Sequence, residues 1–167
     1  MKEIRRLDRS EKEEYKRLKA TVLGTLTDKS WLIPFTEEVE ATMFDVDSTL
    51  LVYGCFVDGV LAAVSTLDTD KAEFFEVAEA AGMPMEKKGG ELGGSMVLPE
   101  YRGQNLMWEI NSVLFAAARD MGFAYLVATA HPDNIASNTS LLKLGLDYKK
   151  TIIRTGSYTR NVYGKEL

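Results

Sequence analysis

Residues 97–107 read Val97-Leu98-Pro99-Glu100-Tyr101-Arg102-Gly103-Gln104-Asn105-Leu106-Met107. An apolar strand predicted over Glu91–Leu98 precedes this stretch, and the clearest predicted helix, Leu106–Met121, follows it. Several backbone N–H groups lack partners where a tight turn becomes a helix, and the helix dipole adds partial positive charge there. With the full charge of Arg102, the stretch predicts a cradle for a phosphate or pyrophosphate. The alternative interpretation is an ordinary turn that carries a surface arginine.

A second strand, predicted over Tyr125–Ala130, follows this helix. It is apolar throughout, which is typical of a parallel strand covered on both faces. Two strands joined through a helix should be parallel with a right-handed crossover, and ligands bind at the carboxyl ends of such strands. Neither Gly-x-x-x-x-Gly-Lys-Ser/Thr nor Gly-x-Gly-x-x-Gly occurs, so the fingerprints of a P-loop and of a Rossmann dinucleotide site are absent.

The rest of the chain predicts further strands and helices around this unit. Asp58-Gly59 favours a type I′ turn between strands over Thr49–Val57 and Val60–Leu67, and a closing hairpin joins Lys150–Thr155 to Tyr158–Tyr163. The other predicted elements are a strand over Glu3–Leu7, a helix from the capping box Ser10-Glu11-Lys12-Glu13 to Gly24, and helices over Glu37–Val46, Asp70–Gly82 and Ile135–Leu144. The order predicts an α/β fold with a mixed sheet.

Length and charge narrow the class of protein. The 167 residues predict one domain over 1–167, at about 150 residues per domain. Lys and Arg total 20 against 25 Asp and Glu, which gives a net charge of −5. Because a nucleic-acid-binding face needs clustered basic residues, we expect no nucleic-acid partner.

Cys55 and His131 are the only cysteine and histidine. One of each cannot build a disulfide framework, a Cys/His zinc site or a paired-histidine metal site, so we expect no metal. The apolar run Val113–Ala118 is far shorter than the ~18 residues of a membrane-spanning helix. Met1–Asp8 lacks the apolar region of a signal peptide. The sequence therefore predicts a cytoplasmic protein without a membrane partner.

Residues 91–146 resemble the core of the GNAT superfamily, the acyl-CoA-dependent N-acyltransferases. That family's pyrophosphate loop follows a strand ending in Val, commonly reads Pro-x-Tyr-Arg-Gly-x-Gly-x-Gly and leads into a long helix. Val97, Pro99, Tyr101, Arg102 and Gly103 stand in register with it, whereas Asn105 and Met107 replace glycine or a small residue. Asn134-Ile135-Ala136-Ser137 matches the family's Asn-x-x-Ala/Ser, and Leu144-Gly145-Leu146 matches its Leu-Gly-Phe.

The resemblance implies the GNAT fold, a mostly antiparallel mixed sheet with a central pair of splayed parallel strands flanked by helices. It implies acetyl-CoA as co-substrate, with the pantetheine arm lying between those two strands like an extra strand. Backbone N–H groups near Val97 and Leu98 would support the thioester carbonyl. The implied acetyl-CoA residues are Met96, Val97, Leu98, Arg102, Gly103, Gln104, Asn105, Leu106, Met107, Asn134 and Ser137. Asn105 is a mild departure because Asn tolerates left-handed backbone angles, while Met107 would narrow the approach of a phosphate.

The resemblance also implies catalytic residues. Glu91 stands where many family members carry the glutamate that deprotonates the acceptor amine; the alternative is a surface glutamate paired with a neighbouring strand. Leu141, seven residues after Asn134, occupies the position of the usual general-acid tyrosine. Tyr148 is the predicted substitute acid, and His131 is the second option, with a structural hydrogen bond as its favoured role.

Three further segments have two interpretations each. Trp31, Leu32, Ile33 and Phe35 favour core packing, and an acceptor pocket is the second option. The insert Asp68–Lys88 would cover the acceptor side or bury Phe74 and Phe75 at a subunit interface, which would make a homodimer. The acidic set Glu37, Glu38, Glu40, Asp45 and Asp47 is typical of a solvated face and could also steer cationic acceptors. Cys55 is predicted to be a small core residue.

Together these features predict an acyltransferase that moves acetyl from acetyl-CoA to a primary amine of a small molecule by direct attack. The alternative is a non-catalytic acyl-CoA-binding or regulatory module, motivated by Leu141, Asn105 and Met107. A third option is the same fold without a CoA site.

Overall fold

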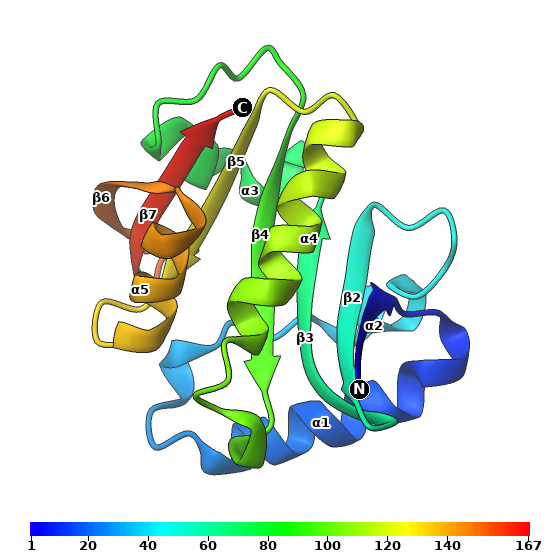
Figure 1. The fold of residues 1–167 in the computed structure, drawn as a ribbon. Coiled ribbons are helices and arrows are strands. Elements are labelled where there is room, and N and C mark those ends of the chain that lie inside the picture. The colour runs from blue at the N-terminus through cyan, green and yellow to red at the C-terminus, as the bar shows by residue number, and fades with distance from the viewer.

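The computed structural model describes residues 1–167, with helices on both faces of a seven-stranded sheet (Figure 1). The strands are β1 (Lys2–Arg6), β2 (Leu50–Val57), β3 (Val60–Asp68), β4 (Gly89–Val97), β5 (Tyr125–Ala130), β6 (Asp147–Arg154) and β7 (Tyr158–Glu166). The helices are α1 (Lys12–Thr25), α2 (Glu37–Thr42), α3 (Lys71–Ala80), α4 (Leu106–Asp120) and α5 (Ile135–Leu144). Short 3₁₀ turns cover Arg9–Glu11, Lys29–Trp31 and Pro99–Tyr101.

The strand order is β1-β2-β3-β4-β5-β7-β6, and only the β4–β5 pair is parallel. Helix α4 connects these two strands, as the sequence predicted for a parallel crossover. Both predicted hairpins are present. Asp58 and Gly59 have φ values of +50° and +84°, which are the angles of the expected type I′ turn.

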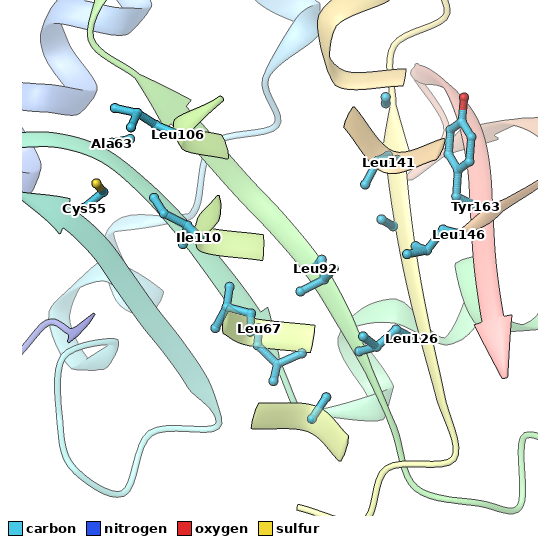
Figure 2. Close-up of a cluster of buried hydrophobic side chains, with 14 of the residues drawn as sticks. Cys55, Ala63, Leu67, Leu92, Leu106, Ile110, Leu126, Leu141, Leu146 and Tyr163 are labelled. Atoms are coloured by element: carbon cyan, nitrogen blue, oxygen red, sulfur yellow. The ribbon is translucent and has the colours of Figure 1, made fainter. Parts of the chain in front are cut away.

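The core lies on both faces of the sheet. On one face, α4 and α5 cover a cluster of buried side chains that includes Cys55, which is therefore a core residue as predicted. Figure 2 shows part of this cluster, where Leu106 and Ile110 of α4 lie against the sheet. On the other face, α1 and α2 cover the β2–β3 side, and α3 covers the β5–β7 side.

Strand β5 is covered on both faces, as its uninterrupted apolar sequence predicted. Leu126 and Ala128 belong to the cluster beneath α4 and α5, whereas Tyr125 and Val127 belong to the cluster beneath α3. All four side chains are buried. Because β5 is buried on both faces, it is a rigid support for any site at its C-terminal end.

Strands β4 and β5 pair only at their beginnings. Their parallel register runs from Gly89 opposite Tyr125 to Leu92 opposite Ala128, and both strands then continue without pairing to each other. Figure 1 shows the two separating toward their C-terminal ends. The splayed parallel pair implied by the family resemblance is therefore present.

An irregularity in β4 accompanies this separation. The β3–β4 register shifts between Val64 and Thr66, and Gly94 on β4 has a φ of +58°. The Gly93 carbonyl accepts a hydrogen bond from Thr66 Oγ1 at 2.9 Å, and Ser65 Oγ lies 3.3 Å from the same oxygen. The Thr66 hydroxyl thus compensates for a ladder bond that the bulge interrupts.

Several predicted boundaries were wrong. The capping box is formed by Asp8 and Glu11, two residues earlier than the expected Ser10 and Glu13. Asp8-Arg9-Ser10-Glu11 has the same spacing and begins a 3₁₀ turn before α1. Helix α1 continues past Gly24 to Thr25. Helix α2 ends at Thr42, not Val46, because Met43 and Phe44 both turn into the core.

The 68–88 insert packs onto the sheet through α3, and two residues of the acidic set form ion pairs. Phe74 of α3 is fully buried in the core beneath α3, while Phe75 is 50% exposed; the homodimer stays a prediction. Glu40 pairs with Lys19, and Asp45 pairs with Arg9 at 2.7 Å. None of the helices combines the length and apolar character that crossing a membrane requires.

The glycine at the start of β4 yields a stability prediction. A Cβ added to Gly89 would lie 2.1 Å from Cζ of Tyr125, whose ring lies across the glycine on the neighbouring strand. We expect Gly89→Ala to lower the free energy of unfolding by about 1–3 kcal/mol, since an overpacked core must shift. The control is Gly24→Ala in α1, where a Cβ meets nothing within 4 Å and should raise stability by up to ~1 kcal/mol. Chemical denaturation measures both, and equal effects would contradict the prediction.

Candidate active site

A cavity of about 380 Å³ opens where β4 and β5 separate. Its two halves have different character. On the side of α4 and α5 it is lined by Gly93, Gly94, Ser95, Met107, Asn111, Ala128, Ala130, Asn134, Ser137 and Leu141. On the side of α3 and the 31–39 segment it is lined by Trp31, Leu32, Ile33, Pro34, Phe35, Thr36, Val39, Asp68, Glu73, Glu91, Thr129, Arg154, Thr155 and Arg160.

The predicted phosphate cradle has the required backbone geometry. Gly103 and Asn105 have positive φ values of +79° and +63°, so the asparagine adopts the left-handed conformation that glycine would. The intrahelical hydrogen bonds of α4 begin with Glu109 N–H to the Asn105 carbonyl at 3.0 Å. The N–H groups of the three preceding residues are therefore free of helical partners. Residues 102–105 are exposed, and an anion can reach them.

Arg102 is tied to the loop that it was predicted to charge. Its Nε donates to the Val97 carbonyl at 3.3 Å, and its Nη2 donates to Thr25 Oγ1 at 3.1 Å. The side chain remains exposed, which leaves its other N–H groups available. Gln104 is exposed too, whereas the Leu106 side chain is buried in the core, so only its backbone could meet a ligand.

The edge of β4 supports one of the two backbone donors that the sequence suggested. The Leu98 N–H donates to the Ala62 carbonyl at 2.8 Å and is therefore not free for a thioester carbonyl. Because backbone groups alternate along a strand, the amide of Val97 faces the opposite edge, toward β5. The Met96 side chain is buried in the core beneath α1.

Met107, Asn134 and Ser137 come together at one wall of the cavity. Ser137 Oγ lies 3.9 Å from Met107 Sδ, and Asn134 caps α5 by accepting the Ser137 N–H at 3.2 Å. The Asn134 side chain is thus a helix cap, which fixes the start of α5 beside the cavity. Met107 packs on α5 and lines this wall, and the narrowed approach of a phosphate stays a prediction.

A buried polar network lies beneath the same half. Ser65 Oγ donates to Asn111 Oδ1 at 2.6 Å and lies 2.7 Å from Ser95 Oγ. A hydroxyl has one proton to donate, so the Ser95 hydroxyl is the donor in its contact with Ser65. The Asn111 amide keeps its two N–H donors for the cavity that it lines.

Glu91 and Arg154 form a buried ion pair in the other half. Arg154 Nη1 and Nη2 donate to Glu91 Oε2 and Oε1 at 2.6 and 2.8 Å, and Glu91 is 8% exposed. Burial raises the pKa of the Glu91 carboxyl, while the Arg154 guanidinium opposes the rise. Glu91 is therefore not the surface glutamate of the alternative interpretation: it is buried, it lines the cavity, and its partner is on β6, which β5 and β7 separate from β4. Its role as a base stays a prediction. Sequence reasoning missed Arg154.

The structure does not bring Tyr148 to the cavity. Its side chain is 51% exposed on β6, and its hydroxyl lies 2.8 Å from Thr151 Oγ1. His131 Nδ1 accepts the Asp133 N–H at 3.1 Å, and its ring stacks on Trp31 at 5.8 Å. Neither residue lines the cavity, whereas Leu141, at the family's tyrosine position, does.

The α3 half of the cavity is lined partly by the 31–39 segment. Trp31, Ile33 and Phe35 line it, and Leu32 and Phe35 also pack against the core as the favoured interpretation predicted. The acceptor pocket stays a prediction.

The α3 half also contains residues that the sequence gave little reason to select. Asp68 and Arg160 line it as well. A charge at the end of an apolar strand is the signal that could have identified Asp68, whereas Arg160 stands between Thr159 and Asn161 and has no such signal.

Asp68 gives a prediction of pH dependence. Burial, assisted by nearby carboxylates, raises the pKa of Asp68 from 3.8 to about 6. The folded state therefore binds the proton more tightly, so stability from this group is full below pH 4 and falls as the pH rises through 6. We expect Asp68→Asn, which keeps an oxygen for the Asp70 N–H, to stabilise the protein at pH 8 by about 1 kcal/mol after solvent screening is allowed for. Thermal unfolding at pH 4 and pH 8 measures this, and a gain of equal size at both would contradict it.

The chain is similar in fold to several solved acetyltransferase structures. The chain resembles an N-acetyltransferase from Staphylococcus aureus Mu50 with 19% identity, a TM-score of 0.74, and coverage of 99% of this chain and 97% of that one. It resembles a probable acetyltransferase from Staphylococcus epidermidis ATCC 12228 with 16% identity, a TM-score of 0.76, and coverage of 100% and 99%. A ribosomal L7/L12 α-N-protein acetyltransferase in complex with coenzyme A matches with 15% identity, a TM-score of 0.72, and coverage of 99% and 94%. No curated protein sequence matches significantly.

The sequence comparison agrees with the fold. Residues 4–146 match the acetyltransferase (GNAT) family, which is most of the chain. Members of this family use acetyl-CoA, and the free N–H groups at the start of α4, together with the gap between β4 and β5, suit such a co-substrate. The chain belongs to the GNAT acetyltransferases, and it is an acyltransferase.

Proposed function

We propose that this acetyltransferase moves the acetyl group of acetyl-CoA to a primary amine of a small molecule by direct attack. The observation that carries the proposal is the single cavity that joins two unlike halves. One half ends at the backbone donors of the α4 start, and the other contains a buried carboxylate. A thioester held in the first half would meet an amine held in the second, which we therefore call the acceptor half.

Acetyl-CoA would be held by the residues predicted from the sequence, in roles that the geometry refines. The N–H groups of Leu106 and Met107, with Gly103, Gln104, Asn105 and Arg102, would bind the pyrophosphate. The Val97 amide would pair with the pantetheine arm beside Met96 and Leu98. Asn134 and Ser137 would form the wall that this arm passes. When bound, acetyl-CoA supplies the activated acyl group.

Glu91 is the proposed base, acting directly or through a water molecule. A primary amine with a pKa near 10.4 is about one part in a thousand neutral at pH 7, so a base can contribute up to ~3 decades in rate. Burial strengthens the Glu91 carboxylate as a base, and Arg154 holds it in place. The neutral nitrogen then attacks the thioester carbon, the C–S bond breaks, and the acceptor's proton leaves through Glu91.

The leaving thiolate needs less help from an acid than the family pattern suggests. A thiol has a pKa near 8.5, so its anion is a tolerable leaving group in water near neutral pH. The Asn111 amide offers hydrogen-bond donors in the α4 half of the cavity. We propose no acid role for Tyr148, because its hydroxyl is exposed and bonded to Thr151.

A protein N-terminus is the competing acceptor. The coenzyme A complex among the similar structures belongs, by its name, to an α-N-protein acetyltransferase. The buried charges and the aromatic wall of Trp31 and Phe35 favour a small molecule that enters the cavity whole. Parallel assays with small amines and short peptides separate the two acceptor classes.

The cradle is tested by calorimetric titration with acetyl-CoA. We expect binding in the micromolar range, weakened about 10- to 100-fold in Arg102→Ala, since a charge-assisted contact is lost. The matched control is Thr25→Val, which removes the hydroxyl that Arg102 contacts without removing the charge. Its affinity should stay near that of the unmodified protein. If neither Arg102→Ala nor Thr25→Val changes affinity, the cradle assignment fails.

The base is tested by Glu91→Gln in a thiol-release assay. We expect turnover of an alkylamine to fall by about 10²- to 10³-fold, because the neutral amine becomes scarce. The affinity for acetyl-CoA should not change. An acceptor whose amine is already neutral at pH 7, such as a hydrazide, should lose much less turnover. Equal losses for both acceptors would mean that Glu91 serves only the ion pair with Arg154.

A further inference from the structure

Arg160 is a buried cation without an anionic partner. It lies on β7, is 2% exposed and lines the acceptor half of the cavity. No carboxylate lies within 4 Å of its guanidinium, although eight such ion pairs occur elsewhere in the chain. Buried arginines are ordinarily paired, because removing the charge from water is costly.

The hydrogen bonds of Arg160 leave most of its donors unused. Nη1 donates to the Thr159 carbonyl at 2.8 Å, and Nη2 donates to the Ser30 carbonyl at 2.6 Å. A guanidinium has five N–H donors, so three have no protein acceptor. The neighbouring Asp28 carboxylate is bonded to the Ser30 amide and hydroxyl and does not pair with Arg160.

The second arginine of the cavity is the informative contrast. Arg154, on the adjacent strand β6, is neutralised by both oxygens of Glu91. Arg154 also raises the positive potential at Arg160, and the pKa of the Arg160 guanidinium is lowered by burial and by that neighbour. The cavity is thus lined by two guanidinium groups and by the carboxylates of Asp68, Glu73 and Glu91, of which only Glu91 forms an ion pair, and that pair is with Arg154.

We propose that Arg160 binds a carboxylate of the acceptor, so that the acceptor is a small aminocarboxylate. This inference rests on the proposed function, because it assigns the acceptor of that reaction. The guanidinium fork matches a carboxylate in two parallel hydrogen bonds, and the carboxylate would supply the missing countercharge.

The strand register supports one molecule bridging both ends of the acceptor half. Glu91 lies opposite Val127 on β5, and Asn161 lies opposite Ala130. Arg160 is therefore displaced from Glu91 by four residue steps, about 13 Å, along β5, and by two strand spacings, about 10 Å, across the sheet. Both side chains line the same cavity, which brings the guanidinium and the carboxylate closer together than their backbones are. The amine would lie at Glu91 and the carboxylate at Arg160.

The test uses acceptors that differ only in the carboxylate. Phenylalanine is compared with phenylalaninamide and phenethylamine, and 4-aminobutyrate with 4-aminobutanamide and butylamine, at equal concentrations of neutral amine. We expect kcat/KM to favour the carboxylate by about 10- to 100-fold, and Arg160→Gln to abolish that preference. The turnover of the acceptors that lack a carboxylate should be unchanged or higher in the Arg160→Gln variant. Arg119→Gln, an exposed arginine on α4, is the matched control and should keep the preference.

A purely structural role for Arg160 predicts a different result. If Arg160 only holds β7 to Ser30, its removal would lower the turnover of acceptors with and without a carboxylate alike. That outcome overturns the proposal. So does an unmodified protein that shows no preference for the carboxylate. If Arg160→Gln does not fold, Arg160→Lys keeps the charge but loses the fork, and a preference reduced several-fold is then the supporting result.

A binding measurement separates this inference from the proposed function. N-Acetylphenylalanine and its amide carry no reactive amine, and thermal shift reports their binding without turnover. Tighter binding of the acid, lost in Arg160→Gln, supports the carboxylate site even if no small amine is acetylated. Acetylation of amines or peptides with no preference for the acid would leave the transferase intact and overturn the carboxylate site.

Discussion

The early end of pairing between β4 and β5 is the constraint on which this protein depends. Parallel strands in a covered sheet ordinarily pair along their shared length, because an unpaired backbone group in the interior is costly. Here pairing stops after Leu92 and Ala128, and both strands continue. The backbone freed by this separation needs other partners, and a co-substrate that pairs with β4 would supply them.

The groups around the gap show how the chain tolerates it without a ligand. The bulge at Gly94 uses a left-handed backbone angle, and the Thr66 hydroxyl donates a hydrogen bond to the Gly93 carbonyl. Asn111, buried in α4, anchors the same region through Ser65. A Cβ at Gly94 would lie 3.0 Å from the Phe35 ring, so the bulge also fixes how closely the aromatic wall of the acceptor half approaches. Both halves of the cavity are shaped by one irregularity.

The sequence predicted the unit from Glu91 to Leu146 well, because each signal there is local. A strand without alternation, a loop of turn-forming residues and an amphipathic helix specify their own conformations, and Asn105 could be assigned a left-handed angle from its side chain alone. The α1 start was misplaced because Asp8 and Ser10 offer the same capping chemistry within two residues. Tertiary packing of Met43 and Phe44 shortened α2 beyond what periodicity can predict.

The charged residues of the cavity were harder to predict for a physical reason. The pairing of Glu91 with Arg154 joins positions 63 residues apart, on strands β4 and β6 that β5 and β7 separate in the sheet. Neither Asp68 nor Arg160 belongs to a local motif, so their burial follows only from the closed fold. Tyr148 was selected because it stands just past α5, yet the start of β6 turns its side chain outward. Closeness in sequence to a motif does not predict where a side chain points at a sheet edge, because alternate residues of a strand face opposite ways.

The departures from the family pattern have consequences of unequal size. Asn105 reproduces the backbone angle of the glycine it replaces, so the loop retains its shape. Met107 packs its thioether against Ser137 at one wall of the cavity, and the N–H groups at the start of α4 remain free of helical partners. Leu141 matters most, because it places an apolar side chain where the family has a hydroxyl. A thiolate tolerates that loss better than an alkoxide would, since its pKa is near 8.5, and the amide of Asn111 remains the polar group that faces the cavity from α4. The chemistry of the leaving group thus explains how a GNAT site can lack its tyrosine and still be able to transfer an acyl group.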